Sequence, residues 1–333
     1  MRRRTFLEVI SAGAAGVVTG GLSELVAAAA STSKSGKTFL LGGDLLVNRL
    51  GFGAMRLTGE GIWGWPPDRE NANKVLRRAV ELGVNFIDTA DAYGPETNEL
   101  LIAEALYPYP KGLVIATKGG NTRPGPGQWV PDGRSEYLAQ CVDKSLKRLK
   151  LERIDLYQLH RIDRKVPVEE SLGALKAAQD AGKIRHVGLS EVTVAEIEQA
   201  KKVLPIVSIQ NQYNITDRDS EAALNYCEKE KMGFIPWAPI GGSRNPSLRN
   251  TGNALEAEAK RHNVQRSATC ARLVAAKITG DVADPGHIVA RASRGEHGRR
   301  ETSAQRGGVE ADRRASAILT THQSIGMDQR TSW

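Results

Sequence analysis

The sequence lacks the signals of several protein classes. Its three cysteines, Cys141, Cys227 and Cys270, are far apart and odd in number, so no disulfide framework is indicated. Its one G-x-G-x-x-G match, at residues 59–64, does not directly follow an apolar run and is followed by Trp-Pro-Pro, so it gives no sign of a Rossmann turn. No His, Asp and Glu cluster occurs at metal-ligand spacing, which disfavours a metal-dependent hydrolase. Despite a formal net charge of +8, no basic stripe alternates with aromatic residues, so we expect no nucleic-acid binding.

The N-terminus has the features of an export signal. Arg3 and Arg4 are followed by Thr-Phe-Leu, which resembles a twin-arginine signal, and alanines at 27–30 suit a cleavage site. The stretch between them is rich in glycine and interrupted by Glu24, so we expect no stable membrane insertion. We therefore expect residues 1–30 to engage the twin-arginine translocase and to direct export to the periplasm or cell exterior. If the leader does not function, the protein stays in the cytoplasm.

After the leader, apolar runs alternate with amphipathic ones. The expected strands are 50–54, 84–87, 113–117, 154–158, 184–189, 206–210 and 234–237. The expected helices are 71–82, 135–149, 168–181, 194–203 and 221–231. Continuous apolar strands that alternate with helices indicate a parallel sheet, and seven such units favour a closed (β/α)8 TIM barrel over a doubly wound sheet. Residues 38–47 read as a hairpin that caps the bottom of the barrel.

Polar residues follow these apolar runs where the strands end. Asp88 follows the second run, Lys118 the third and His160 the fourth. Ser190 follows the fifth run, and Gln210 ends the sixth. Because the active sites of β/α barrels lie at the C-terminal ends of the strands, these side chains should converge on one mouth.

The strings around these residues resemble one family. FIDTADAYG at residues 86–94, ATK at 116–118, LYQLH at 156–160 and GLS at 188–190 are similar to the aldo/keto reductases in order and spacing. The resemblance covers residues 38 to 263. It implies a TIM barrel that reduces a small carbonyl substrate with NADPH bound extended across the barrel.

Carried onto matching positions, the resemblance implies a catalytic tetrad of Asp88, Tyr93, Lys118 and His160. Tyr93 would give a proton to the carbonyl oxygen, and Lys118 would lower the pKa of that phenol from its usual value of about 10. Asp88 would hold Lys118, while His160 would orient the substrate oxygen. Taken singly, each residue has an ordinary structural explanation, such as a turn or cap for Asp88 and core packing for His160.

The resemblance also implies residues that bind NADP(H). Ser190 and Gln210 match positions that hold the nicotinamide carboxamide, and Trp237 matches the aromatic residue on which the nicotinamide stacks. The sequence departs from the family at Glu191, where asparagine is usual, since a carboxylate has no hydrogen to donate. Further contacts are expected from Gly53, Met55 and Arg56 after the first strand, and from Ala238, Pro239, Ile240 and Gly241 after the seventh.

The pattern breaks down near the C-terminus. Past Val264 the pattern is lost, so residues 266–333 are expected to be an aberrant tail. Residues 291–314 lack a sustained period and have the composition of a disordered or out-of-frame segment. Codons allowed for 267–297, read one base later, spell a string that contains AWLL and IPGTSS, which resembles the missing phosphate loop of the family. We therefore expect a frameshift near 264–267 and a barrel of residues 38–265 that is incomplete at its C-terminal end.

Two functions from different classes remain open. An intact tetrad favours an oxidoreductase that converts an aldehyde or ketone to an alcohol. The altered C-terminus favours a catalytically dead remnant or a regulatory protein that keeps the shape of the barrel.

Overall fold

The computed structural model describes residues 38–214, 216–239 and 260. The chain divides into two units, Met1–Thr38 and Phe39–Trp333, and the sheet lies in the second. None of the helices among the described residues has the length and apolar character that are needed to cross a membrane.

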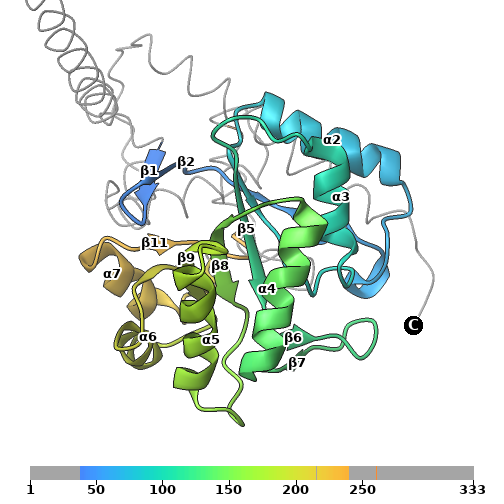
Figure 1. Ribbon diagram of the computed structural model, residues 1–333. Coiled ribbons are helices and arrows are strands. Elements are labelled where there is room, and N and C mark those ends of the chain that lie inside the picture. The colour runs from blue at the N-terminus through green and yellow to red at the C-terminus, as the bar shows by residue number, and fades with distance from the viewer. Residues whose placement is uncertain (1–37, 215, 240–259, 261–333) are drawn as a thin grey trace, which may run out of the picture. The chain divides into compact units, whose positions relative to one another are not determined.

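Seven strands form one parallel sheet in which neighbours along the chain are neighbours in space, apart from the small hairpin β6–β7 (Figure 1). The order from one edge is β11-β10-β9-β8-β5-β4-β3. All seven coincide with the predicted apolar runs, shifted by a few residues. The strands are β3 (Phe52–Gly53), β4 (Phe86–Asp88), β5 (Val114–Gly119), β8 (Ile154–Leu159), β9 (Ile184–Ser190), β10 (Ile206–Gln210) and β11 (Gly233–Phe234).

Helices connect these strands, as a parallel sheet requires. Five of the helices were predicted. Two of them begin at a capping side chain: Asp68 accepts a hydrogen bond from the backbone N–H of Asn71 at the start of α2, and Thr193 forms a capping box with Glu196 at the start of α6. The helices are α2 (Arg69–Glu81), α3 (Thr97–Leu106), α4 (Ser135–Leu149), α5 (Val168–Asp180), α6 (Val194–Lys201) and α7 (Glu221–Lys229). Of these, α3 was not predicted.

Strand side chains alternate between two buried environments. Ile87, Ile115 and Tyr157 pack in the two apolar clusters that also contain the helix residues. Their neighbours Phe86, Val114, Ala116 and Leu156 belong to a third cluster on the opposite face of the sheet. This period of two places alternate residues on the inner face of a barrel. The expected (β/α)8 fold is thereby confirmed for the seven described units, and the expected eighth unit lies outside the described residues.

The predicted N-terminal hairpin is present as β1 (Thr38–Leu41) and β2 (Leu45–Asn48). Leu41, Leu45 and Val47 share the inner cluster with residues at the beginnings of β4 and β5. At the tip of the hairpin, Asp44 accepts hydrogen bonds from the Arg185 side chain near the start of β9. The hairpin therefore covers the N-terminal ends of the strands and leaves their C-terminal ends for the functional residues.

A buried ion pair ties α3 and α4 to β5. Glu99, which has no exposed side-chain area, accepts from the Arg148 guanidinium at 2.6 Å. Its other oxygen accepts from the Thr117 hydroxyl of β5 at 2.5 Å. Arg148 also lies 3.1 Å from Glu96. Because Thr117 precedes Lys118, this pair fixes β5 at the point where the strand reaches the candidate site.

Replacing Arg148 with Met should lower the free energy of unfolding by about 3–5 kcal/mol, because Glu99 would remain buried without its cation. Urea unfolding followed by circular dichroism measures this loss. The matched control is Arg78→Met, which removes the exposed pair of Arg78 with Glu81 and should cost at most about 1 kcal/mol. Equal losses in the two variants would contradict the prediction.

Candidate active site

Three residues of the predicted tetrad lie at the ends of three neighbouring strands, and the fourth lies in a loop beside them. Asp88 is the last residue of β4, Lys118 lies one residue before the end of β5, and His160 directly follows β8. Tyr93 lies in the loop between β4 and α3. Asp88 and Lys118 continue the inward positions of their strands, so the alternation along each strand aims both side chains into the barrel.

Lys118 is the centre of the hydrogen-bond network. Its side chain has no exposed area, and its ammonium donates to Asp88 Oδ2 at 2.7 Å, to the Thr89 carbonyl at 2.8 Å and to Tyr93 Oη at 3.2 Å. Burial alone lowers the pKa of Lys118, but Asp88 and Tyr93 together raise it above the usual value. Lys118 is therefore charged, and its three donors are all used.

Asp88 is held by two amides from other strands. Gln158 Nε2 of β8 and Gln210 Nε2 of β10 donate to Asp88 Oδ1 at 3.1 Å and 2.9 Å. The prediction gave Gln210 only a cofactor role, and Gln158 was missed. The signal for Gln158 was available, because it is a buried polar residue two positions after Leu156, on the inward side of β8.

His160 packs against two aromatic rings. Its ring lies edge-on to Tyr93, with centroids 5.7 Å apart, and to Trp129, with centroids 5.9 Å apart. Burial, and then the nearby charges of Lys118 and Arg161, hold its pKa well below the usual 6.5. The imidazole is therefore neutral near pH 7, with one donor and one acceptor nitrogen. Among the described residues, none is hydrogen-bonded to its buried Nδ1.

The pKa of Tyr93 differs from the expectation. The charge of Lys118 does lower it, as predicted, but burial is the larger cause and raises the pKa of the phenol above 10. The predicted net lowering of the Tyr93 pKa is therefore wrong. Tyr93 is a protonated phenol that is only 5% exposed, which suits a group that gives up a proton only when charge develops beside it.

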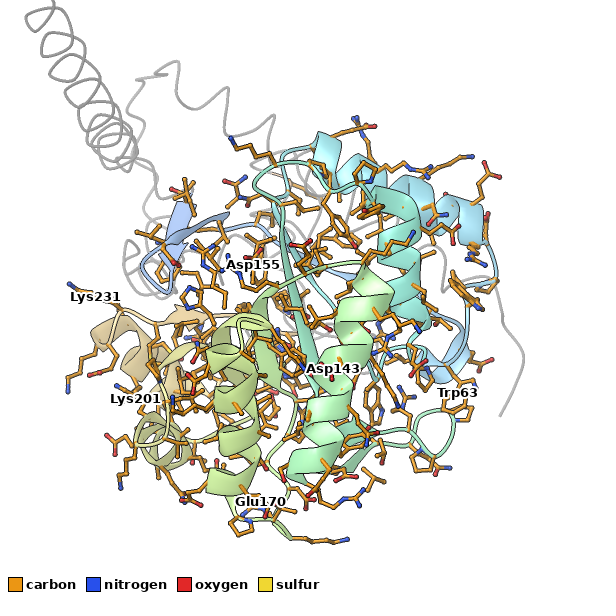
Figure 2. The ribbon with its side chains drawn as sticks, viewed as in Figure 1. Trp63, Asp143, Asp155, Glu170, Lys201 and Lys231 are labelled. Atoms are coloured by element: carbon orange, nitrogen blue, oxygen red, sulfur yellow. The ribbon has the colours of Figure 1, made fainter. Side chains whose placement is uncertain are left out.

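Trp129 and Arg123, which were not predicted, form one wall of the site. Trp129 lies just before β7 (Val130–Pro131), in the loop that joins it to β6 (Asn121–Thr122). The guanidinium of Arg123 stacks 3.7 Å from the centre of its ring. That guanidinium also donates to the carbonyl oxygens of Ala92 at 2.6 Å and Ile62 at 3.1 Å. It thereby links the loop that carries Tyr93 to the segment around Trp63. The side chain of Trp63 is labelled in Figure 2.

The predicted cofactor residues lie at the ends of neighbouring strands. Ser190 and Gln210 are register partners on β9 and β10, and they are 2% and 4% exposed. Arg161, another residue that was missed, donates from Nη1 to Ser190 Oγ at 3.0 Å. At the far edge of the sheet, Trp237 continues beyond β11, where its backbone N–H donates to the Asn211 carbonyl at 3.1 Å.

The remaining predicted contacts lie at the two edges of the sheet. Gly53 is the register partner of Asp88, and a side chain added there would meet no atom of the described residues within 4 Å, which leaves its backbone accessible from that part of the chain. Met55 and Arg56 follow in a short 3₁₀ helix, η2 (Ala54–Arg56). Ala238 and Pro239 directly follow Trp237. Ile240 and Gly241 lie outside the described residues.

Comparison with known proteins identifies the family. The model of the aldo/keto reductase family matches residues 49–291. The chain belongs to the aldo/keto reductase family. Among its relatives, an uncharacterised oxidoreductase of Schizosaccharomyces pombe is 51% identical over 218 residues, which cover 66% of this chain and 70% of the relative. Pyridoxine 4-dehydrogenase of Escherichia coli is 41% identical over 214 residues, which cover 62% and 74%.

Solved structures agree with this assignment to the aldo/keto reductases. The glycerol dehydrogenase of Gluconobacter oxydans superimposes with a TM-score of 0.64 at 25% identity, over 90% of this chain and 100% of that one. An aldo-keto reductase of Bacillus halodurans gives a TM-score of 0.58 at 27% identity, over 83% and 96%. The expected fold and enzyme family are confirmed, and the chain is an oxidoreductase by family.

The depressed pKa of His160 predicts a pH effect on stability. Because the folded pKa lies below the unfolded value of about 6.5, the unfolded chain binds more protons between the two values. The contribution of His160 is thus complete above pH 6.5 and is lost as the pH falls toward the folded pKa. Below pH 6.5, the free energy of unfolding of wild type should fall by up to about 1.4 kcal/mol per pH unit more than that of His160→Gln. Urea unfolding from pH 7.5 to 5 measures both, and parallel profiles would contradict the prediction.

Proposed function

We propose that this aldo/keto reductase uses NADPH to reduce the carbonyl group of a small aldehyde or ketone to an alcohol. The observation that carries the proposal is the buried network in which Lys118 contacts both Asp88 and the Tyr93 hydroxyl, with His160 beside the same phenol. This arrangement places a proton donor, a fixed positive charge and a neutral imidazole at one point.

Each residue of this network has a distinct part in the reaction. Tyr93 gives its proton to the carbonyl oxygen as the carbon accepts a hydride. The phenolate that forms is stabilised by Lys118, whose ammonium already lies 3.2 Å from the oxygen. Asp88 holds that ammonium in place. His160, being neutral, donates a hydrogen bond that orients the substrate oxygen without competing for the proton.

The residues present fit a nicotinamide cofactor. Ser190 and Gln210 place a hydroxyl and an amide side by side for its carboxamide, and Trp237 offers a partly exposed ring. Gly53 leaves space beside Asp88 on the other edge. When bound, NADPH supplies the hydride. The preference for NADPH over NADH rests on the family alone.

The substrate class is a small carbonyl compound or the corresponding alcohol. Two relatives, a pyridoxine dehydrogenase and a glycerol dehydrogenase, are named for chemically different alcohols. The nearer of the two, at 41% identity, makes an aromatic aldehyde the first compound to test. The aromatic wall of Trp129 beside His160 supports that choice.

Replacing Tyr93 with Phe should lower kcat for carbonyl reduction by about 100-fold or more, because the proton donor is lost while the ring and its packing remain. NADPH oxidation at 340 nm measures the rate, and quenching of tryptophan fluorescence measures cofactor binding, which should be unchanged. The control is Tyr107→Phe, since Tyr107 is 52% exposed and lies after α3. Equal activity in both variants would refute the role of Tyr93.

The same titration tests the alternative of a catalytically dead remnant. It should be made with the leaderless chain as written and with a version in which the reading frame is restored after residue 264. Saturable quenching by the chain as written supports an active enzyme. Quenching by the restored version alone supports the inactive remnant and the proposed frameshift.

We further propose export by the twin-arginine route, on the basis of Arg3, Arg4 and the Phe-Leu pair that follows them. A chain with both Arg3→Lys and Arg4→Lys should remain inside the cell, whereas the control Arg2→Lys should be exported like wild type. Cell fractionation of tagged full-length protein measures this. Equal export of all three chains would refute the proposal.

A further inference from the structure

Glu191 stands where asparagine is usual in the family, and its carboxylate accepts two hydrogen bonds in the structure. Glu191 Oε1 accepts hydrogen bonds from two groups of the next strands: the indole Nε1–H of Trp237 and the backbone N–H of Gln212, the latter at 2.8 Å. An asparagine amide oxygen would sit on a side chain that is one carbon shorter. The side chain of Glu191 therefore reaches toward Trp237, and it is not available to a carboxamide beside Ser190.

These bonds fix the indole of Trp237 from both ends. The backbone N–H of Trp237 donates to Asn211 at 3.1 Å, and Gln212 is its parallel bridge partner. The side chain has only two torsion angles and a single donor, Nε1–H. Once the backbone and Nε1 are both held, the plane of the ring is determined. Glu191 thus sets the orientation of the partly exposed surface of Trp237.

The backbone conformation of Glu191 is unusual for a glutamate. Its φ is +57°, in the left-handed region that asparagine and glycine adopt far more readily than glutamate. Its own N–H donates to the Gln210 carbonyl at 3.0 Å, which holds it at this turn. A glutamate therefore occupies a position whose backbone conformation favours asparagine. Its side chain is one carbon longer than that of asparagine and reaches the Trp237 indole.

Arg161 supplies the hydrogen-bond donors that Glu191 lacks. Its Nη1 lies 3.0 Å from Ser190 Oγ and 2.6 Å from the His160 carbonyl, so guanidinium N–H groups stand beside the hydroxyl that the cofactor carboxamide is expected to meet. Glu191 also lies close enough to interact electrostatically with that guanidinium. The change at residue 191 thus leaves the site with donors, and it frees the carboxylate to hold the indole.

We infer that Glu191 is a positioning residue that orients the Trp237 indole as the stacking surface for the nicotinamide. The inference rests on the proposed function, because it takes Trp237 as part of the cofactor site. It assigns Glu191 an indirect part in binding: the carboxylate contacts the ring and the ring contacts the cofactor.

The test uses the full chain labelled with 5-fluorotryptophan, with the Trp237 signal in the fluorine NMR spectrum assigned by Trp237→Phe. Glu191→Asn keeps a residue that suits a positive φ but is too short to reach the indole. Its Trp237 signal should shift and change width, while its melting temperature stays equal to or above that of wild type. Glu191→Gln keeps both length and acceptor oxygen, and its signal should stay close to that of wild type. Glu198→Asn, on the exposed side of α6, is the control and should change nothing.

NADPH titration of the same proteins provides the second measurement. Losing the indole bond should raise the Kd for NADPH roughly threefold to tenfold in Glu191→Asn, and Glu191→Gln should bind like wild type. A Trp237 signal that is identical in wild type and Glu191→Asn would overturn the inference. A changed signal with unchanged NADPH affinity would also overturn it. If wild type binds no NADPH, the proposed function fails, and the fluorine spectra still decide whether Glu191 holds Trp237.

Discussion

A buried lysine charge is the constraint on which the rest of the site depends. The ammonium of Lys118 is completely shielded from water, and an unpaired charge there would be far too costly for a stable fold. Asp88 and the Thr89 carbonyl offset that cost, and the Tyr93 hydroxyl takes the third donor. The contact between the Lys118 ammonium and the Tyr93 hydroxyl therefore follows from a requirement of folding as well as of chemistry.

The partners of the buried Lys118 charge are themselves held by hydrogen bonds from other strands of the sheet. Asp88 uses one oxygen for Lys118, and its other oxygen accepts from two glutamines on β8 and β10. Four strand ends, those of β4, β5, β8 and β10, are thereby connected through polar side chains of the inner face. Since each partner would lose a hydrogen bond if a strand shifted in register, the network holds the mouth of the barrel together.

The outward face of β5 carries a second group of buried charges. Thr117 contacts Glu99, which is paired with Arg148 from α4. Nearby, burial first and then the charge of Glu99 raise the pKa of Asp91 to about 7. Consecutive residues of one strand thus serve two polar systems, one on each face of the sheet. The alternation of side chains along the strand keeps the catalytic charge apart from this structural ion pair.

The sequence was most informative where side chains repeat with the period of a strand or where a family string was intact. Apolar runs located all seven strands, and the strings placed Lys118 and His160 correctly at their ends. It was least informative where contacts join segments far apart in the chain. The bond of Arg123 to Ile62 and the donation of Gln210 to Asp88 span 61 and 122 residues, and no local pattern encodes such pairs. The pKa of Tyr93 was misjudged for a related reason, since a neighbouring charge is visible in a motif and the extent of burial is not.

Close approach of the strands explains why small residues accompany the polar ones. A side chain on Gly188 of β9 would come within 2.3 Å of Ser208 Oγ and 3.1 Å of Gln158 Cγ. A side chain on Gly119, directly after Lys118, would come within 2.1 Å of Tyr157 Oη. These glycines let β5, β8, β9 and β10 approach one another, so that amides from β8 and β10 reach a single carboxylate on β4. The GLS string and the glycine after ATK are thus steric requirements of the same network, because a larger residue at either position would separate the strand ends whose side chains hold Asp88 and Lys118.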